Sequence, residues 1–141
     1  MIDVNFWAVI VAGIVSMVLG FLWYGPVFGK KWMGMMGYNQ SHIDEAKARG
    51  GMSKSYLIAF IGSLVTAYVL AHIITMAQIA GISSGVSGGL QSGFWAWLGF
   101  IATVGLGSVL WEGRKWNLYT FNMAYQLVNL LLMGLIIGAW M

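Results

Sequence analysis

Polar side chains recur on one face of the last apolar segment of this chain. Asn122, Tyr125, Gln126 and Asn129 are spaced i, i+3, i+4 and i+7, which places them on a single stripe of an α-helix. Their amide and phenol groups bind by hydrogen bonding, and such a stripe is costly to expose to lipid. The stripe therefore predicts either hydrogen bonds between helices or the wall of a narrow polar pathway or pocket.

His72 is the one Asp, Glu, Lys, Arg or His side chain that falls inside an apolar segment. A lone histidine there could ligate a metal or haem, relay a proton, or hydrogen-bond to Tyr125 or Gln126 on a neighbouring helix. We favour the last interpretation. Because no Asp or Glu accompanies it within an apolar segment, the sequence argues against a proton-coupled antiporter.

The chain does not offer the groups from which an active site is usually built. Enzymes need a positioned nucleophile, base or metal, and one histidine among amide side chains does not supply that set. Cysteine is absent, which removes thiolate metal sites and thiol nucleophiles. We therefore predict a protein that is not an enzyme and that has no metal or other cofactor.

The composition is that of a membrane protein. Hydrophobic residues make up 60% of the 141 residues and charged residues only 8%, whereas a soluble domain has about 25% charged residues. A helix of about 20 apolar residues crosses a bilayer. The sequence predicts a single integral membrane domain over residues 1–141, an all-α, four-helix transmembrane bundle. Its helices are expected at about Val4 to Tyr24, Tyr56 to Gln78, Ser92 to Trp111 and Leu118 to Trp140.

The polar segment 25–54 has internal order. Gly25-Pro26 predicts the end of the first helix, because proline lacks an N–H and restricts the residue before it. Ser41 begins a capping box that predicts a short helix through Arg49. Apolar residues at near-helical spacing predict a short amphipathic element in the cytoplasmic headgroups. They are Phe28, Trp32, Met33 and Met36, beside Lys30 and Lys31.

The charges predict the orientation. Every Lys and Arg lies in 30–54 or 114–115, and the Gly/Ser-rich segment 80–90, read as a flexible connection, has none. The positive-inside rule then places both termini outside the cytoplasm. We expect a multi-pass protein of the cytoplasmic (inner) membrane. The net charge of +3 comes from the loops, so it indicates contact with the lipid bilayer and not with nucleic acid.

Small residues are frequent along the apolar segments, where they allow helix backbones to approach closely. Gly134-x-x-x-Gly138 is the clearest match to a close-packing motif. More small-residue faces occur than one four-helix bundle needs, so the sequence predicts a homo-oligomer. Other members of these faces are Ser63, Gly99 and Gly107.

Several motifs resemble the DUF1761 family of small bacterial membrane proteins of unknown function. Residues 23–32 resemble its W-Y-S-P-x-x-F-G-x-x-W signature, with Gly25 in place of the usual Ser. Residues 112–114, 122–128 and 133–140 resemble its E-x-R, N-x-G-Y-x-L-V and M-G-x-I-x-G-x-W pattern, with Ala124 in place of the usual Gly. The resemblance implies the same architecture for nearly the whole chain and implies no activity.

Two functions are consistent with these observations. The first is a self-associating bundle with a structural, binding or interaction role. The alternative is a small channel or transporter for a neutral or cationic solute, whose path would be lined by His72 and the polar stripe of the last helix.

Overall fold

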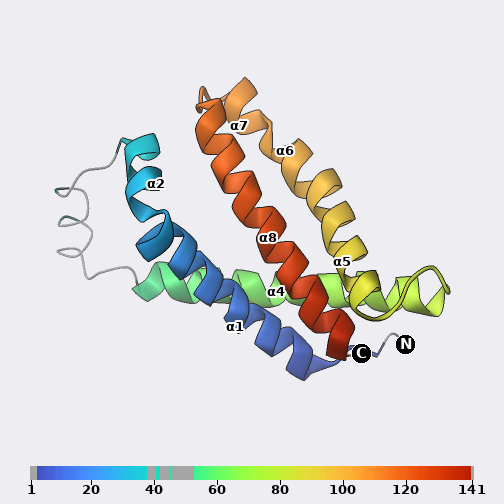
Figure 1. Ribbon diagram of the computed structural model, residues 1–141. Coiled ribbons are helices and arrows are strands. Elements are labelled where there is room, and N and C mark those ends of the chain that lie inside the picture. Colours follow the sequence, from blue (N-terminus) through green and yellow to red (C-terminus); the bar gives the residue numbers. More distant parts are fainter. Residues whose placement is uncertain (1–2, 38–40, 42–44, 46–52, 141) are drawn as a thin grey trace.

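The computed structural model describes residues 3–37, Ser41, Glu45 and 53–140, and these contain helices and turns but no strand (Figure 1). The elements are α1 (Phe6–Leu22), the π-helical turn η1 (Trp23–Val27), α2 (Gly29–Met36), α4 (Ser53–Ile79), α5 (Gly85–Ala96), the π-helical stretch η2 (Trp97–Ala102), α6 (Thr103–Gly105), α7 (Gly107–Leu110) and α8 (Trp116–Trp140). The short helix predicted to run from Ser41 through Arg49 lies outside the described residues except for Ser41 and Glu45.

The all-α fold is confirmed. Four helical stretches in the described part of the chain are long and apolar enough to cross a membrane, and they cover 6–27, 53–79, 85–110 and 116–140. The first, second and fourth agree with the predicted segments to within a few residues. The third begins seven residues before the predicted Ser92 (92 − 85 = 7).

The residues at the two ends of α1 explain where this helix begins and where it ends. The Asn5 side chain accepts hydrogen bonds from the backbone N–H groups of Trp7 and Ala8, at 3.0 and 3.3 Å, and so caps α1. At the other end η1 contains Pro26 and a non-helical Gly25, with φ −119° and ψ −110°. The chain bends there and continues as α2, so the predicted stop and the predicted short element are both present.

The third span shows where the prediction of a flexible connection was wrong. Residues 85–90 belong to α5, although glycine is a poor helix former. Close packing explains this, because Gly89 and Gly93 lie directly against the backbone of α8. The buried residues of α5 are Gly88, Gly89, Ser92 and Gly93. Glycine here permits close approach of two helices and does not provide flexibility.

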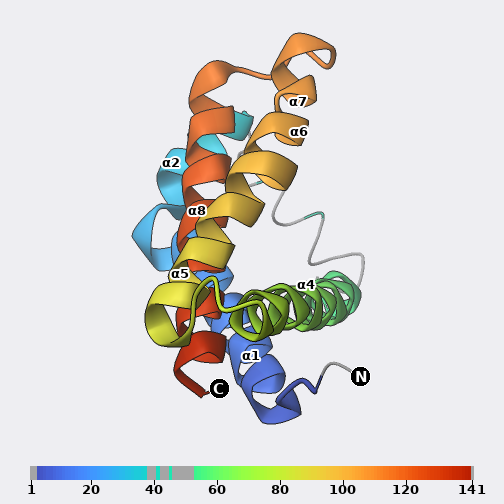
Figure 2. The same cartoon turned by 90° about the vertical axis from the view of Figure 1, so that its right-hand side faces the viewer.

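The helices do not all run side by side. The third span and α8 are adjacent, whereas α4 crosses behind them and behind α1 (Figures 1 and 2). In Figure 2 α4 is seen almost along its axis, while α5 and α8 run up the picture. As a result only the second half of α4 is buried, from Ala67 to Thr75. Its first seven residues, 53–59, are all exposed.

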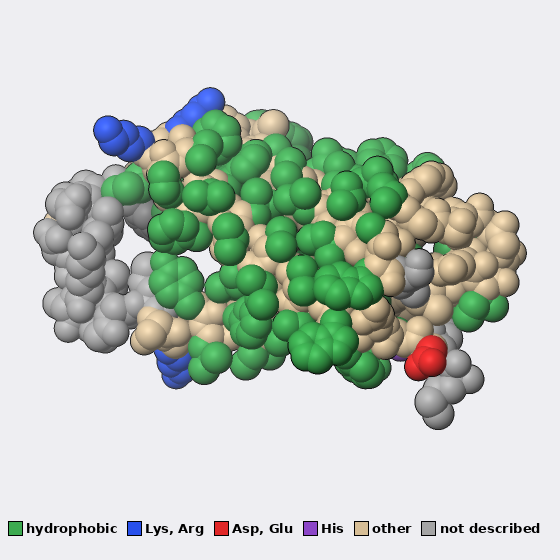
Figure 3. Space-filling model, turned by 60° about the horizontal axis from the view of Figure 1, so that its bottom comes forward, with side chains coloured by type: hydrophobic (Ala, Val, Ile, Leu, Met, Phe, Trp, Pro, Cys, Tyr) green, Lys and Arg blue, Asp and Glu red, His purple; other side chains and the backbone are tan. Residues whose placement is uncertain are grey.

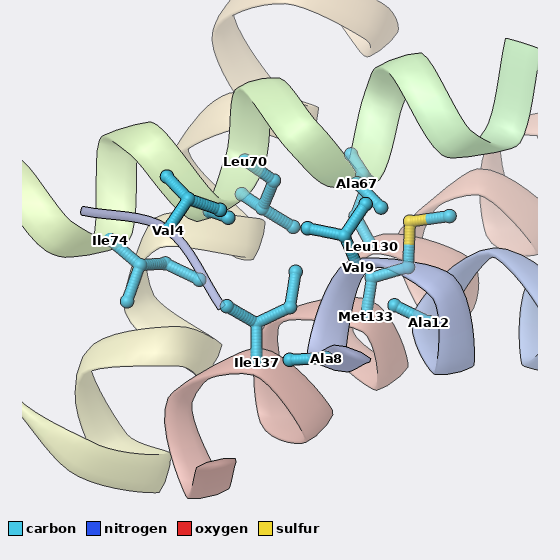
Figure 4. Packing of buried hydrophobic residues seen from close by; sticks show 11 residues of the cluster. Val4, Ala8, Val9, Ala12, Ala67, Leu70, Ile74, Leu130, Met133 and Ile137 are labelled. Atoms are coloured by element: carbon cyan, nitrogen blue, oxygen red, sulfur yellow. The ribbon is translucent and has the colours of Figure 1, made fainter. Parts of the chain in front are cut away.

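The apolar core lies where α1, α4 and α8 meet (Figure 4). Met133 and Ile137 of α8 are fully buried in it, against small residues of α1 such as Ala8 and Ala12. Charged side chains stay outside this core. Figure 3 shows the Lys and Arg side chains in one half of the molecule and an acidic side chain at the opposite end.

Candidate functional site

A cavity of about 550 Å³ lies between η1, α2, α8 and the turn before α8. These elements meet at the end of the molecule where the N-terminal turns of α8 lie close to α2 (Figure 1). The volume falls within the range of roughly 300–1,000 Å³ that is usual for small-molecule pockets. The described lining residues combine aromatic, amide, apolar and basic side chains. They are Tyr24, Trp32, Met36, Ser108, Arg114, Leu118, Tyr119, Asn122, Met123 and Gln126.

The bend after α1 brings two of these walls together. Tyr24 in η1 donates a hydrogen bond from its hydroxyl to Asn122 Oδ1 of α8, at 2.7 Å. Its ring also meets Trp32 of α2 edge-on, with 5.3 Å between the ring centroids. Gly29 makes this possible, because a Cβ there would lie 2.9 Å from the Tyr24 carbonyl oxygen. The cavity therefore depends on glycine at the first residue of α2.

Deeper in the molecule the polar groups bond across helices. Tyr125 of α8 faces α1, on which Ser16 is also buried. Ser16 Oγ in turn lies 3.4 Å from Ser63 Oγ on α4. Gly20 leaves room for the phenol, since a Cβ there would lie 3.0 Å from the Tyr125 hydroxyl oxygen. Ser16 and Ser63 thus join α1 to α4, and Tyr125 packs α8 against α1.

Asn129, the last residue of the polar stripe, is buried without a hydrogen bond to its side-chain oxygen among the described residues. It is only 6% exposed. One residue further along α8 the apolar core begins with Leu130 and continues to Ile137. The stripe predicted on the last helix is therefore divided. Asn122 and Gln126 line the cavity, Tyr125 packs against Gly20 of α1, and Asn129 is buried outside the cavity lining.

His72 lies apart from this stripe. Its Nδ1 is 2.9 Å from the carbonyl oxygen of Tyr68, one turn earlier on α4. Its ring lies edge-on to the ring of the same tyrosine, with 4.4 Å between centroids. The hydrogen bond of His72 is therefore made within its own helix, and not with Tyr125 or Gln126 as the sequence analysis favoured.

The glycine motif of α8 is used inside the chain. A Cβ at Gly134 would overlap the carbonyl group of Gly89, and one at Gly138 would overlap that of Gly85. Both partners belong to α5, so this motif joins the third and fourth spans of one molecule. The other small residues differ. Ser63 bonds to α1, a Cβ at Gly107 would meet only Trp111 at 3.7 Å, and Gly99 has open space around it.

Sequence reasoning missed most of the cavity wall. Tyr24, Trp32 and Arg114 were recognised only as residues of helix ends and motifs, because their meeting with Asn122 depends on how distant segments fold together. One signal was available. These three residues and Asn122 all belong to the motifs that carry the family resemblance.

Comparison with protein-family models agrees with that resemblance. The model described as "Protein of unknown function (DUF1761)" matches residues 7–138, which is nearly the whole chain. Comparison with curated proteins gave no match, and neither did comparison with solved structures.

Proposed function

The chain belongs to the DUF1761 family, and we propose that this membrane protein is a binding protein for a small amphiphilic molecule held in the cavity beside α2. The family description gives no activity, so the proposal is based on the cavity itself. The observation that carries it is the hydrogen bond from Tyr24 to Asn122, which holds an amide in the wall of a cavity of about 550 Å³.

The lining suits a ligand with a polar head and an apolar body. Arg114, Asn122 and Gln126 offer hydrogen-bond donors on the α8 side. Apolar and aromatic surface is contributed by Trp32 and Met36 of α2. Side chains of mixed character of this kind are typical of the membrane–water interface. A cavity at the end of the spans would be reached by a molecule that enters at that level.

The alternative, a channel or transporter for a neutral or cationic solute, has less support. The cavity lining stops at Gln126, and the fully buried Met133 and Ile137 lie further along α8. A path for a solute would have to open this apolar packing. A cation would in addition be repelled by Arg114 at the cavity.

Self-association is a separate part of the proposal. The glycine motif of α8 does not support it, because Gly134 and Gly138 pack against α5 of the same molecule. The remaining support is the exposed beginning of α4, residues 53–59. A second copy could cover this exposed surface.

Native mass spectrometry in a mild detergent tests both ligand binding and self-association. The protein would be mixed with lysophosphatidylcholine, lysophosphatidylglycerol and octyl glucoside, and the retained adducts and the number of copies would be measured. Ser108→Phe places a ring in the cavity wall, whereas Val104→Phe adds the same ring at a site 72% exposed in the same span. We expect only Ser108→Phe to abolish the adducts. Equal retention by both variants would contradict the binding proposal.

A further inference from the structure

We propose that the cavity selects a molecule carrying a phosphate group, which Arg114 holds together with the amides of Asn122 and Gln126. This inference rests on the proposed function and names the class of ligand. The phosphate could belong to a lipid headgroup or to a free solute, and the test below separates these two sources.

Arg114 is fixed at the edge of the cavity by the backbone of the turn before α8. Its N–H donates to the Ser108 carbonyl oxygen at 3.0 Å. The preceding Gly113 adopts the left-handed conformation, with φ 72°, which a side chain would strain. The turn therefore presents the guanidinium group beside the first residues of α8. A guanidinium has five N–H donors and no acceptor, in a planar arrangement that matches phosphate oxygens.

The amides next to it also act as donors. The Tyr24 hydroxyl donates to Asn122 Oδ1, at 2.7 Å, and so occupies the acceptor end of this amide. The NH₂ end is left for a ligand. Gln126 adds a second primary amide one turn further along α8. Of the other polar groups, Ser108 already donates its hydroxyl proton to the Gly105 carbonyl oxygen, at 2.8 Å.

The charge of the cavity has one sign. Among the described residues that line it, Arg114 is the only charged one. The nearby Glu112 belongs to the same turn and is not among the described lining residues. A cavity with one cation, two amide donors and no carboxylate in its described lining favours an anion over a neutral or cationic group.

The apolar part of the cavity indicates where the rest of the ligand would lie. Trp32 and Met36 contribute the α2 side, and Leu118 and Met123 contribute the α8 side. A single acyl chain could pack against these residues while its head reaches Arg114. Lysophosphatidylglycerol has this combination of one chain and one phosphate diester, so it serves as the probe.

Affinities for lysophosphatidylglycerol and for octyl glucoside would be measured in detergent by microscale thermophoresis. Arg114→Gln removes the positive charge, and Arg114→Lys keeps the charge but lacks the planar guanidinium group. As a control, Lys115→Gln removes a neighbouring positive charge that does not line the cavity. We expect Arg114→Gln to weaken lysophosphatidylglycerol binding about 10-fold or more, because charge-assisted hydrogen bonds are lost. Arg114→Lys should weaken it less, and Lys115→Gln less than about twofold.

Octyl glucoside separates the failure of this inference from the failure of the proposed function. Equal binding of both probes, unchanged by Arg114→Gln but abolished by Ser108→Phe, would overturn the phosphate preference and leave the binding cavity in place. An equal loss in Lys115→Gln and Arg114→Gln would also overturn it. If neither probe binds in a way that Ser108→Phe abolishes, both proposals fail.

Inorganic phosphate identifies the source of the ligand. Competition by millimolar phosphate, lost in Arg114→Gln, would support the site and assign it to a free phosphate-bearing solute. Binding of lysophosphatidylglycerol that is sensitive to Arg114→Gln but not displaced by phosphate would support the site and assign it to a lipid headgroup.

Discussion

Two asparagines on the same helix show how differently one residue type is used in this protein. Asn122 accepts a hydrogen bond from Tyr24 at 2.7 Å and lines the cavity. Asn129, two turns later, is buried with its Oδ1 unpaired among the described residues. The sequence places both on one stripe but cannot tell them apart, because the spacing fixes the face of the helix and not the partner that covers it.

The two asparagines should therefore respond differently to substitution. Asn129→Leu removes a buried acceptor that has no partner, so thermal stability in detergent should stay the same or rise. Tyr24→Phe removes the donor to Asn122 and should lower stability by about 0.6 kcal/mol, the average for hydrogen bonds between membrane helices, whose maximum is about 1.7 kcal/mol. A clear loss of stability in Asn129→Leu, with none in Tyr24→Phe, would contradict this assignment.

At the scale of elements, the glycines show what a pattern of small residues can predict and what it cannot. The motif of Gly134 and Gly138 predicted close packing, and the structure contains it between α8 and α5. The segment 85–90 was taken for a flexible connection because it is rich in glycine and serine. Hydropathy could not reveal that these glycines face those of α8, since a small-residue face does not specify its partner.

This packing predicts a sharp contrast between two glycines. Gly134→Ala would place a methyl group against the backbone of Gly89, where neither helix can yield without separating, so the melting temperature should fall strongly. Gly62→Ala occupies open space on a helix and should raise stability by up to about 1 kcal/mol. Thermal melts of both variants in the same detergent, followed by circular dichroism, provide the comparison. Equal melting temperatures would argue against the α5–α8 interface.

At the scale of the whole molecule, the sequence predicted the number of spans and the break after the first one. It did not predict that α4 crosses the other helices, because apolar length shows that a helix can enter a bilayer and says nothing of its angle. The cavity was missed for a related reason. Its walls come from residues as distant as Tyr24 and Gln126.

The orientation of the whole chain remains a prediction. Single cysteines at Ser84 and at Ser41 can be labelled against a background without native thiols. Because every Lys and Arg lies within 30–54 or 114–115, an impermeant maleimide should reach Ser84→Cys from outside intact spheroplasts and Ser41→Cys only after lysis. Labelling of both residues from the same side would contradict the predicted orientation.

The stretch between Lys54 and Glu112 has a consequence for how the chain enters a membrane. From Ser55 to Trp111 it has no Asp, Glu, Lys or Arg, and it includes almost all of α4, the turn that follows it and the whole third span. The second and third spans can therefore insert into the bilayer as a helical hairpin without moving an Asp, Glu, Lys or Arg side chain across it. The glycines of α5 would then meet α8 only after α8 itself has been synthesised, so the close contact between these two helices forms after α5 has entered the bilayer.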